Sequence, residues 1–364
     1  MWRKLLRILG FLIGWGAILA YICYASHLAQ AHRAEQRVTK VMVSMTDSTE
    51  TRQFASSAQI AAQLKRSGLD MKGELVDSVN AVKLANYITD KGFVNDADVY
   101  VTYSGELHIN IKQHEPVMRL LCGGLNSYIT SEGDVFRSPQ GAAYYTMVVT
   151  GGYRPMFVPK NDGDIDSEYA LLMAKEEARL NKLGEEFSSL IKERRACREG
   201  ISNLKDDARR RVFESKKSHK QREVAINLEI AKYNEKLKQI EVRKMQLEQR
   251  QRGIELRKKK LQKKYDDFRN LINFVGEISN DTFWRAEVVQ FIADTTSTGE
   301  ISLRMIPRSG DFIITIGTLA ESDVKMRKLQ EFYKNGLSRL GWDRFKRVDL
   351  RYRKQVICAE AAEE

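Results

Sequence analysis

The chain has 364 residues and a formal charge of +12 at neutral pH. This length is enough for two or more domains with ordinary cores. The five histidines show no metal-ligand spacing, and the glycine pairs lack the strand-to-helix context of a phosphate loop. No motif therefore favours an enzyme, a metal site or a bound cofactor.

The first predicted element is a membrane anchor. Residues 8–25 carry no charge, and they follow three cations within residues 1–7. About 18 apolar residues are just enough to cross a bilayer as a helix, and cations before them favour a cytoplasmic N-terminus. A cleaved signal peptide is the alternative, because Ala29-Gln30-Ala31 resembles a cleavage site.

The predicted anchor limits which partners the positive charge could bind and which cysteines could form a disulfide. A translocated domain does not meet nucleic acid, so the excess of cations favours an acidic protein or anionic lipid as partner. Cys23 lies in the predicted anchor and Cys197 in a charged stretch. Cys122 and Cys358 are the only plausible disulfide pair, although free buried thiols are the preferred interpretation.

After a linker over residues 26–37, residues 38–115 predict a β-α-α-β-β unit. Ser56 or Ser57 opens a first short helix, and Asn80 is a suitable N-cap for a second. Two alternating apolar segments follow, and a Ser-Gly turn between them is typical of a β-hairpin.

A second, β-rich unit comes in two parts, residues 116–165 and 269–358, before a short tail over 359–364. The predicted elements of this unit are strands Val117–Leu121, Ser127–Thr130, Met147–Thr150, Ala286–Ala293, Glu300–Ile306 and Phe312–Gly317, and a helix Asp323–Leu340.

Between these parts, residues 166–268 predict an antiparallel helical hairpin with coiled-coil packing. Apolar residues alternate at spacings of three and four from Tyr169 to Leu204, and they recur every seven residues from Ile226 to Val275. The polar segment between the two runs is the expected tip, with Gly200 as the alternative. Residues 168–270 carry 29 Lys and Arg against 18 Asp and Glu, so this stretch supplies +11 of the charge.

The chain ends in a predicted strand from Phe345 to Cys358. Apolar and basic side chains alternate along it, so one face is apolar and the other positively charged. A terminal strand leaves backbone N–H and C=O groups free on one side, which invites a visiting strand. We therefore expect this strand to dock a partner.

In this order, the segments resemble the FtsQ/DivIB family of bitopic cell-division proteins, whose POTRA-like unit precedes a β domain. The stretches that carry the resemblance are Val99–Pro116, Tyr128–Phe136, Val148–Gly151, Phe283-Trp284, Phe332-Tyr333, Gly341-Trp342 and Asp349-Leu350-Arg351-Tyr352. The expected fold class is α+β: one transmembrane helix, a POTRA-like domain, and a mixed α/β domain that the helical hairpin interrupts. The hairpin is the departure from the family.

The resemblance implies a scaffold of the division machinery, the divisome, in the cell inner membrane at the septum, with its C-terminal domains in the periplasm. FtsQ-like proteins bind the small coiled-coil proteins FtsB and FtsL through their terminal strands, so FtsB-like and FtsL-like partners and other divisome proteins are implied. The contact residues carried over are Arg351 and Tyr352, with Leu350, Lys354 and Val356 beside them. Composition alone favours sheet core for Tyr352 and a solvated position for Arg351.

The main alternative is a periplasmic membrane-fusion adaptor of an efflux or secretion pump, which also has an N-terminal anchor and an inserted hairpin. Lipoyl-like halves should bracket such a hairpin closely, whereas a POTRA-like unit precedes this one. A chain-length regulator with a periplasmic coiled coil is a third possibility, but it normally has a second membrane helix near its C-terminus.

Overall fold

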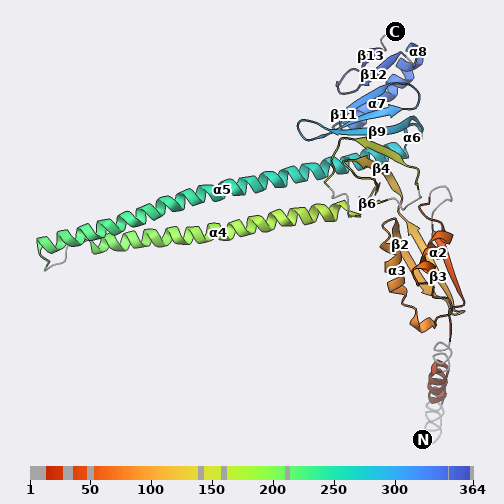
Figure 1. Ribbon diagram of the computed structural model, residues 1–364, viewed down its shortest axis with the longest axis horizontal. Helices are drawn as coiled ribbons and strands as arrows, with labels where there is room; N and C mark the ends of the chain where they lie inside the picture. Colours follow the sequence, from red (N-terminus) through yellow and green to blue (C-terminus); the bar gives the residue numbers. More distant parts are fainter. Residues whose placement is uncertain are drawn as a thin grey trace, which may run out of the picture.

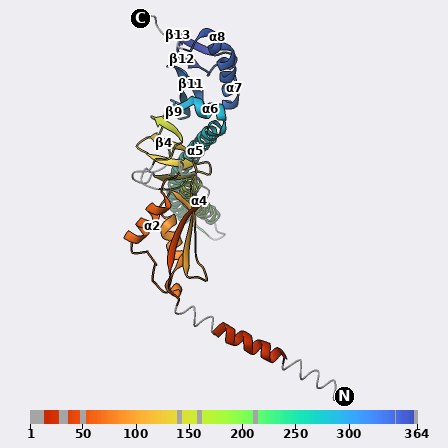
Figure 2. The ribbon, with the colours of Figure 1, turned by 90° about the vertical axis from the view of Figure 1, so that its right-hand side faces the viewer.

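The computed structural model describes residues 14–27, 36–46, 53–137, 143–156, 162–209, 214–342 and 344–360. Two folded domains lie one after the other, and a pair of long helices projects sideways from the second (Figures 1 and 2). Residues 14–27 are helical, whereas residues 8–13 of the predicted anchor lie outside the described ranges. Within those ranges, no helix is both long enough and apolar enough to span a membrane.

The N-terminal domain has the expected β-α-α-β-β order. Its elements are β1 (Lys40–Thr46), α2 (Ser57–Arg66), the 3-10 turn η1 (Val76–Ser78), α3 (Ala81–Thr89), β2 (Val94–Val101) and β3 (Glu106–Gln113). The central strand β3 runs parallel to β1 and antiparallel to β2. Ser56 and Asn80 accept hydrogen bonds from the first turns of α2 and α3, as N-caps do.

The second domain is built on a ten-stranded mixed sheet with the order β13-β12-β11-β10-β9-β7-β4-β5-β6-β8. Its strands are β4 (Pro116–Cys122), β5 (Ser127–Thr130), β6 (Asp134–Arg137), β7 (Met147–Gly151), β8 (Gly163–Asp164), β9 (Val288–Thr295), β10 (Ile301–Pro307), β11 (Ile313–Thr318), β12 (Phe345–Asp349) and β13 (Ile357–Glu360). Its shorter helical segments are α6 (Thr282–Glu287), α7 (Ser322–Phe332), η2 (Tyr333–Leu337) and α8 (Ser338–Leu340).

Two long helices form the projecting part. Helix α4 (Ile165–Asp207) leads outward from the sheet, and α5 (Lys216–Asn280) returns beside it (Figure 1). The 43 residues of α4 span about 65 Å at about 1.5 Å per residue. The helix break comes after Asp207 and not at Gly200, the alternative tip. We call the paired residues 165–209 and 214–265 the arm.

The arm buries the residues of the predicted seam. Leu190 and Cys197 of α4 pack with Ile240 and Leu247 of α5. Gly200 allows the helices to approach closely, since a Cβ there would lie 2.9 Å from Cζ of Tyr233. Tertiary packing of this apolar stripe stabilises helices that are rich in charge.

Helix α5 does not stop at the base of the arm. It continues past residue 268, where we expected the insertion to end, and its last turns cover the sheet. The buried residues of this section are Phe268, Leu271, Ile272, Phe274, Val275 and Ile278. They share one core with strands on both sides of the insertion, so a single helix belongs to the arm and to the domain.

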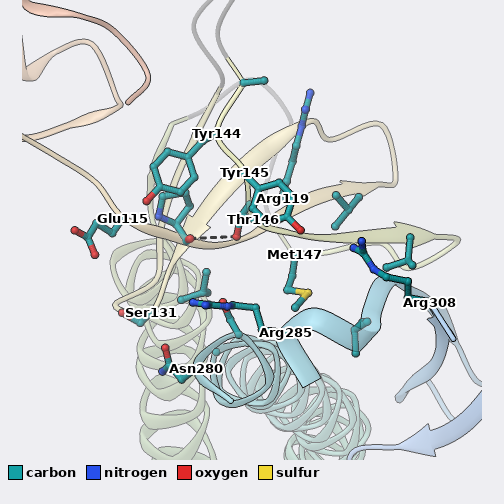
Figure 3. A pocket seen from close by; sticks show the side chains of 18 residues that line it. Glu115, Arg119, Ser131, Tyr144, Tyr145, Thr146, Met147, Asn280, Arg285 and Arg308 are labelled. Carbon is teal, nitrogen blue, oxygen red and sulfur yellow. Dashed lines mark hydrogen bonds between the residues drawn. The ribbon is translucent and has the colours of Figure 1, made fainter. Parts of the chain in front are cut away.

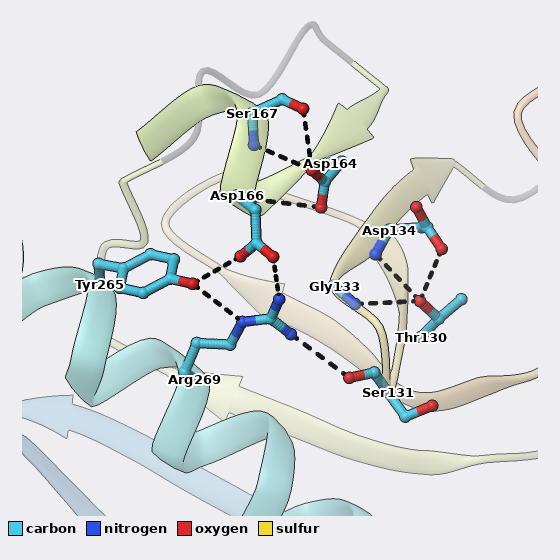
Figure 4. Close-up of polar contacts among 9 residues, drawn as sticks. All are labelled: Thr130, Ser131, Gly133, Asp134, Asp164, Asp166, Ser167, Tyr265 and Arg269. Carbon is cyan, nitrogen blue, oxygen red and sulfur yellow. Dashed lines mark hydrogen bonds and ion pairs between the residues drawn. The ribbon is translucent and has the colours of Figure 1, made fainter. Parts of the chain in front are cut away.

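A polar cluster fixes the base of the arm to the sheet (Figure 4). Asp166, at the start of α4, is ion-paired with Arg269 of α5 and accepts a hydrogen bond from Tyr265 at 2.6 Å. Arg269 also donates to the carbonyl of Ser131, 3.4 Å away, in the β5–β6 turn. Hydrogen bonds from Arg269 and Tyr265 hold the pKa of the Asp166 carboxyl below its usual range.

Aromatic rings join the two domains. Phe54 precedes α2, and its ring centroid lies 4.9 Å from that of Tyr128 in β5 and 5.2 Å from that of Phe136 in β6. All three side chains are buried in one cluster with the core of the N-terminal domain. Aromatic contacts of this geometry add to the stabilisation from apolar burial, so we expect the domains to move as one body.

The structure excludes a disulfide between Cys122 and Cys358. Cys122 ends β4 and Cys358 lies in β13, and five strands separate β4 from β13 in the sheet. Six inter-strand spacings of about 4.8 Å therefore separate the two cysteines by about 29 Å, far more than a disulfide can bridge. Both thiols are free, and burial raises the pKa of the Cys122 thiol to about 12.

We predict that His114, which links the two domains, makes stability depend on pH. Burial lowers the pKa of its imidazole, although Asp134, whose Oδ2 lies 3.5 Å from Nδ1, and Glu132 oppose this shift. The unfolded chain then binds a proton that the folded chain binds more weakly, so the free energy of unfolding falls as the pH drops below about 6.5. Denaturant titrations at several pH values should show a smaller fall in the free energy of unfolding for His114→Gln than for the unmodified chain. An equal fall in the two proteins would contradict this role of His114.

Candidate interaction site at the C-terminal edge of the sheet

The C-terminal segment forms a hairpin and not the single strand that we expected over Phe345–Cys358. Strand β12 pairs in parallel with β11, and β13 folds back antiparallel on β12, with Val348 opposite Cys358. The prediction of one continuous strand was therefore wrong, because the chain leaves the sheet after Asp349. Among the described strands β13 has no neighbour on its outer side, so the free sheet edge lies at residues 357–360.

A lysine holds the loop between these strands in place. Lys328 of α7 donates hydrogen bonds to the carbonyls of Leu350 (3.0 Å), Tyr352 and Gln355 (3.3 Å). Burial lowers the pKa of this ammonium group, and nearby Asp349 partly offsets the shift. No sequence signal identified Lys328, because its partners are backbone atoms more than 20 residues away.

Arg351 is fixed against its own hairpin. Its guanidinium forms two hydrogen bonds of 3.0 and 2.6 Å to Oδ2 of Asp349, and its N–H donates to Oδ1. Hydrogen bonds from Arg351 lower the pKa of Asp349. Gly317 of β11 has φ +75°, and a Cβ there would lie 2.7 Å from Cγ of Arg351, so glycine leaves room for that side chain.

The predicted contact residues divide into three groups in the structure. Leu350 is fully buried in the core, and its N–H donates to the carbonyl of Thr315, so its side chain does not face a partner. Val356 is half-buried and packs on the same core. Tyr352 is 47% exposed, and Lys354 is exposed beside it. The loop therefore offers an aromatic ring and cations next to an unpaired strand.

A groove in this domain lies elsewhere, between the middle of the sheet and the end of α5 (Figure 3). It has a volume of about 650 Å³, and its lining includes Arg119, Arg285, Arg308, Glu115 and Tyr145. Three guanidinium groups and one carboxylate favour anionic over cationic groups there. In the part of the chain that the structure describes, no three His, Cys, Asp or Glu side chains are placed to hold a metal ion.

Comparisons with known proteins agree with this architecture. The family described as FtsQ/DivIB, C-terminal related, matches residues 241–359, and a POTRA-like domain matches residues 36–112. Residues 113–240, which include α4, lie outside both matches. No curated protein matches the chain. The resemblance to FtsQ/DivIB that the sequence indicated is confirmed.

We predict that Lys328→Met loosens the loop of residues 350–356. Methionine keeps the apolar stem but removes three donors, so the free energy of unfolding should fall by about 1 to 3 kcal/mol. Amide hydrogen exchange should speed up at Arg351 to Ile357 and not in the N-terminal domain. The matched control is Lys354→Met, which removes an exposed ammonium and should change stability by less than about 0.5 kcal/mol. Unchanged exchange in Lys328→Met would show that the loop does not depend on the lysine.

Proposed function

The chain is an FtsQ/DivIB-related protein, and we propose that it is a membrane-anchored scaffold of the cell-division machinery. The matched domains suggest a cell-division role, and the FtsQ/DivIB family is a non-enzymatic family of cell-division scaffolds. In this proposal the C-terminal hairpin docks small bitopic coiled-coil proteins of the FtsB and FtsL type and so helps to control septal cell-wall synthesis. In this proposal the segment over residues 8–25 is a membrane anchor, and the folded domains lie on the periplasmic side of the inner membrane.

The observation that carries this proposal is the free edge of β13 beside Tyr352. Unpaired N–H and C=O groups on an edge strand can extend the sheet with a strand from another protein. Tyrosine and arginine are enriched among residues that dominate binding energy, because each combines a large contact area with hydrogen-bonding atoms. Arg351, already oriented by Asp349, and exposed Lys354 favour a partner segment with carboxylates.

The membrane-fusion adaptor is less well supported. Such an adaptor needs two lipoyl-like halves that close around the base of the hairpin. Here β8, which leads into the arm, and β9, which follows it, belong to one open ten-stranded sheet in which four strands separate them. The FtsQ/DivIB-related match also continues through this sheet to residue 359.

We predict that Tyr352→Asp releases the partners. Full-length tagged protein is expressed in its native host, solubilised from membranes, and its bound proteins are identified. The unmodified chain should retain short single-pass coiled-coil proteins, and Tyr352→Asp should retain at least about tenfold less, because a buried unpaired carboxylate is costly in an interface. Since Tyr352 is exposed, the change creates no core cavity.

The matched control is Tyr103→Asp, at an exposed tyrosine in the β2–β3 turn of the other domain. It should retain partners as the unmodified chain does. Equal loss in both variants would indicate a general effect of the added charge and reject the C-terminal site. Pump or outer-membrane channel components on all three forms would instead favour the adaptor.

A further inference from the structure

One face of α5 carries exposed apolar side chains along the arm. Each of these side chains stands two positions before or after a buried seam residue. Two positions correspond to a rotation of about 200° around a helix, so these side chains lie on the side away from the seam. These residues, which we call the outer stripe, are Val224 (64% exposed), Leu228 (62%), Val242 (49%), Met245 (56%) and Leu256 (54%). A helix that has already buried one side gains nothing for its own folding from a second apolar side.

The outer face of α4 provides an internal comparison. Leu171, near the start of α4, is apolar and exposed at such a position. From 181 onward, the positions two residues from the seam are Asn181, Glu185, Ser188, Lys192, Arg195 and Glu199, and all are exposed. They are polar and of mixed charge, as expected for a face that meets only water. Both helices belong to the same arm, so the outer stripe is a property of α5 and not of a long hairpin as such.

Charge is unevenly distributed around α5. The exposed cations along the outer stripe are Lys232, Lys238, Arg252, Lys259 and Lys260. The exposed carboxylates there are Glu235, paired with Lys238 at 3.8 Å, and Glu255, next to Leu256. Within the described ranges, no ion pair joins the other four cations to a carboxylate. In contrast, Glu241 faces α4, where it pairs with Arg194 at 3.5 Å. Five exposed cations against two exposed carboxylates leave an excess of positive charge along the outer stripe.

We propose that the outer stripe binds an acidic amphipathic helix of a partner protein. Two pairs of its apolar residues, Val224 with Leu228 and Val242 with Met245, stand four and three positions apart and fit the apolar side of a second helix. The cations between and beside these pairs, such as Lys238 and Arg252, select carboxylates on that helix. From Val224 to Leu256 the stripe extends about 48 Å, which matches a partner helix of about 30 residues.

Two other occupants fit the observations less well. A second copy of the arm brings its own net charge of +11 over residues 168–270, so two arms repel each other. A lipid interior favours an unbroken apolar side, whereas the charged residues Glu235, Lys238 and Arg252 interrupt the outer stripe. The proposal does not rest on docking at β13, since the arm and that edge are separate surfaces (Figure 1).

Site-specific photocrosslinking on the full chain in its native host tests the proposal. A photoreactive amino acid replaces Met245 on the outer stripe or, as matched control, Ser188 on the outer face of α4. Irradiation should give a discrete protein adduct from position 245 and none from position 188. Mass spectrometry of the adduct should map it to a segment with apolar residues at helical spacing and a net negative charge.

Charge reversal then tests the recognition. Arg252→Glu with Lys259→Glu should lower the yield of the 245 adduct about tenfold, whereas Lys182→Glu with Lys192→Glu on α4 should leave it unchanged. Both pairs lie on exposed helix positions, and circular dichroism checks that the helices remain. An adduct to lipid, to a second copy of this chain or to a basic segment, or no adduct at position 245, would overturn the proposal. Loss of the C-terminal partners with this adduct intact would affect only the proposed function.

Discussion

The rest of the structure depends on the burial of the last turns of α5 against the ten-stranded sheet. Phe268, Leu271 and Val275 are fully buried there, yet they lie on the same 65-residue helix that forms the return half of the arm. A helix is stiff over a few turns, so its orientation on the sheet sets the direction of the arm. The contact between Asp166 and Arg269 adds a second attachment at the start of α4.

This arrangement separates the two proposed interaction surfaces of the protein. The C-terminal hairpin presents a strand edge at one end of the sheet, and the arm presents a helix face on a separate part of the molecule (Figure 1). Both surfaces are basic, and neither needs the other to form. The aromatic joint around Phe54 attaches the N-terminal domain to the same sheet, so partners on different surfaces are held at fixed separations.

Helices and strands whose apolar residues recur with a regular period were predictable from the sequence. The seven-residue repeat in α5 and the alternation of Leu107, Ile109 and Ile111 in β3 report burial that recurs in step with the helix or strand. The end of the arm was not predictable in the same way. Apolar residues continue through Val275 in the same repeat, so the sequence contains no sign that their partner changes from α4 to the sheet.

The candidate site was predicted only in part. The alternation of apolar and basic residues across 345–358 predicted one long strand. The chain instead turns after Asp349, because the N–H of Leu350 donates to the carbonyl of Thr315 and Lys328 binds the loop carbonyls. These contacts join residues far apart in the sequence and use backbone atoms, which carry no residue-specific signal. Tyr352 is exposed, whereas its own pattern favoured the core. Its choice as a contact residue came from the family resemblance and stays a prediction.

The most direct test of this account is the distance distribution between the arm and the sheet. Spin labels at Gln249 on α5 and at Ser297 in the β9–β10 turn, in the full chain with its native cysteines replaced, report this distance by pulsed electron resonance. A continuous, buried α5 predicts one narrow peak. A broad or multiply peaked distribution would mean that the arm pivots on the sheet, and would contradict the rigid scaffold.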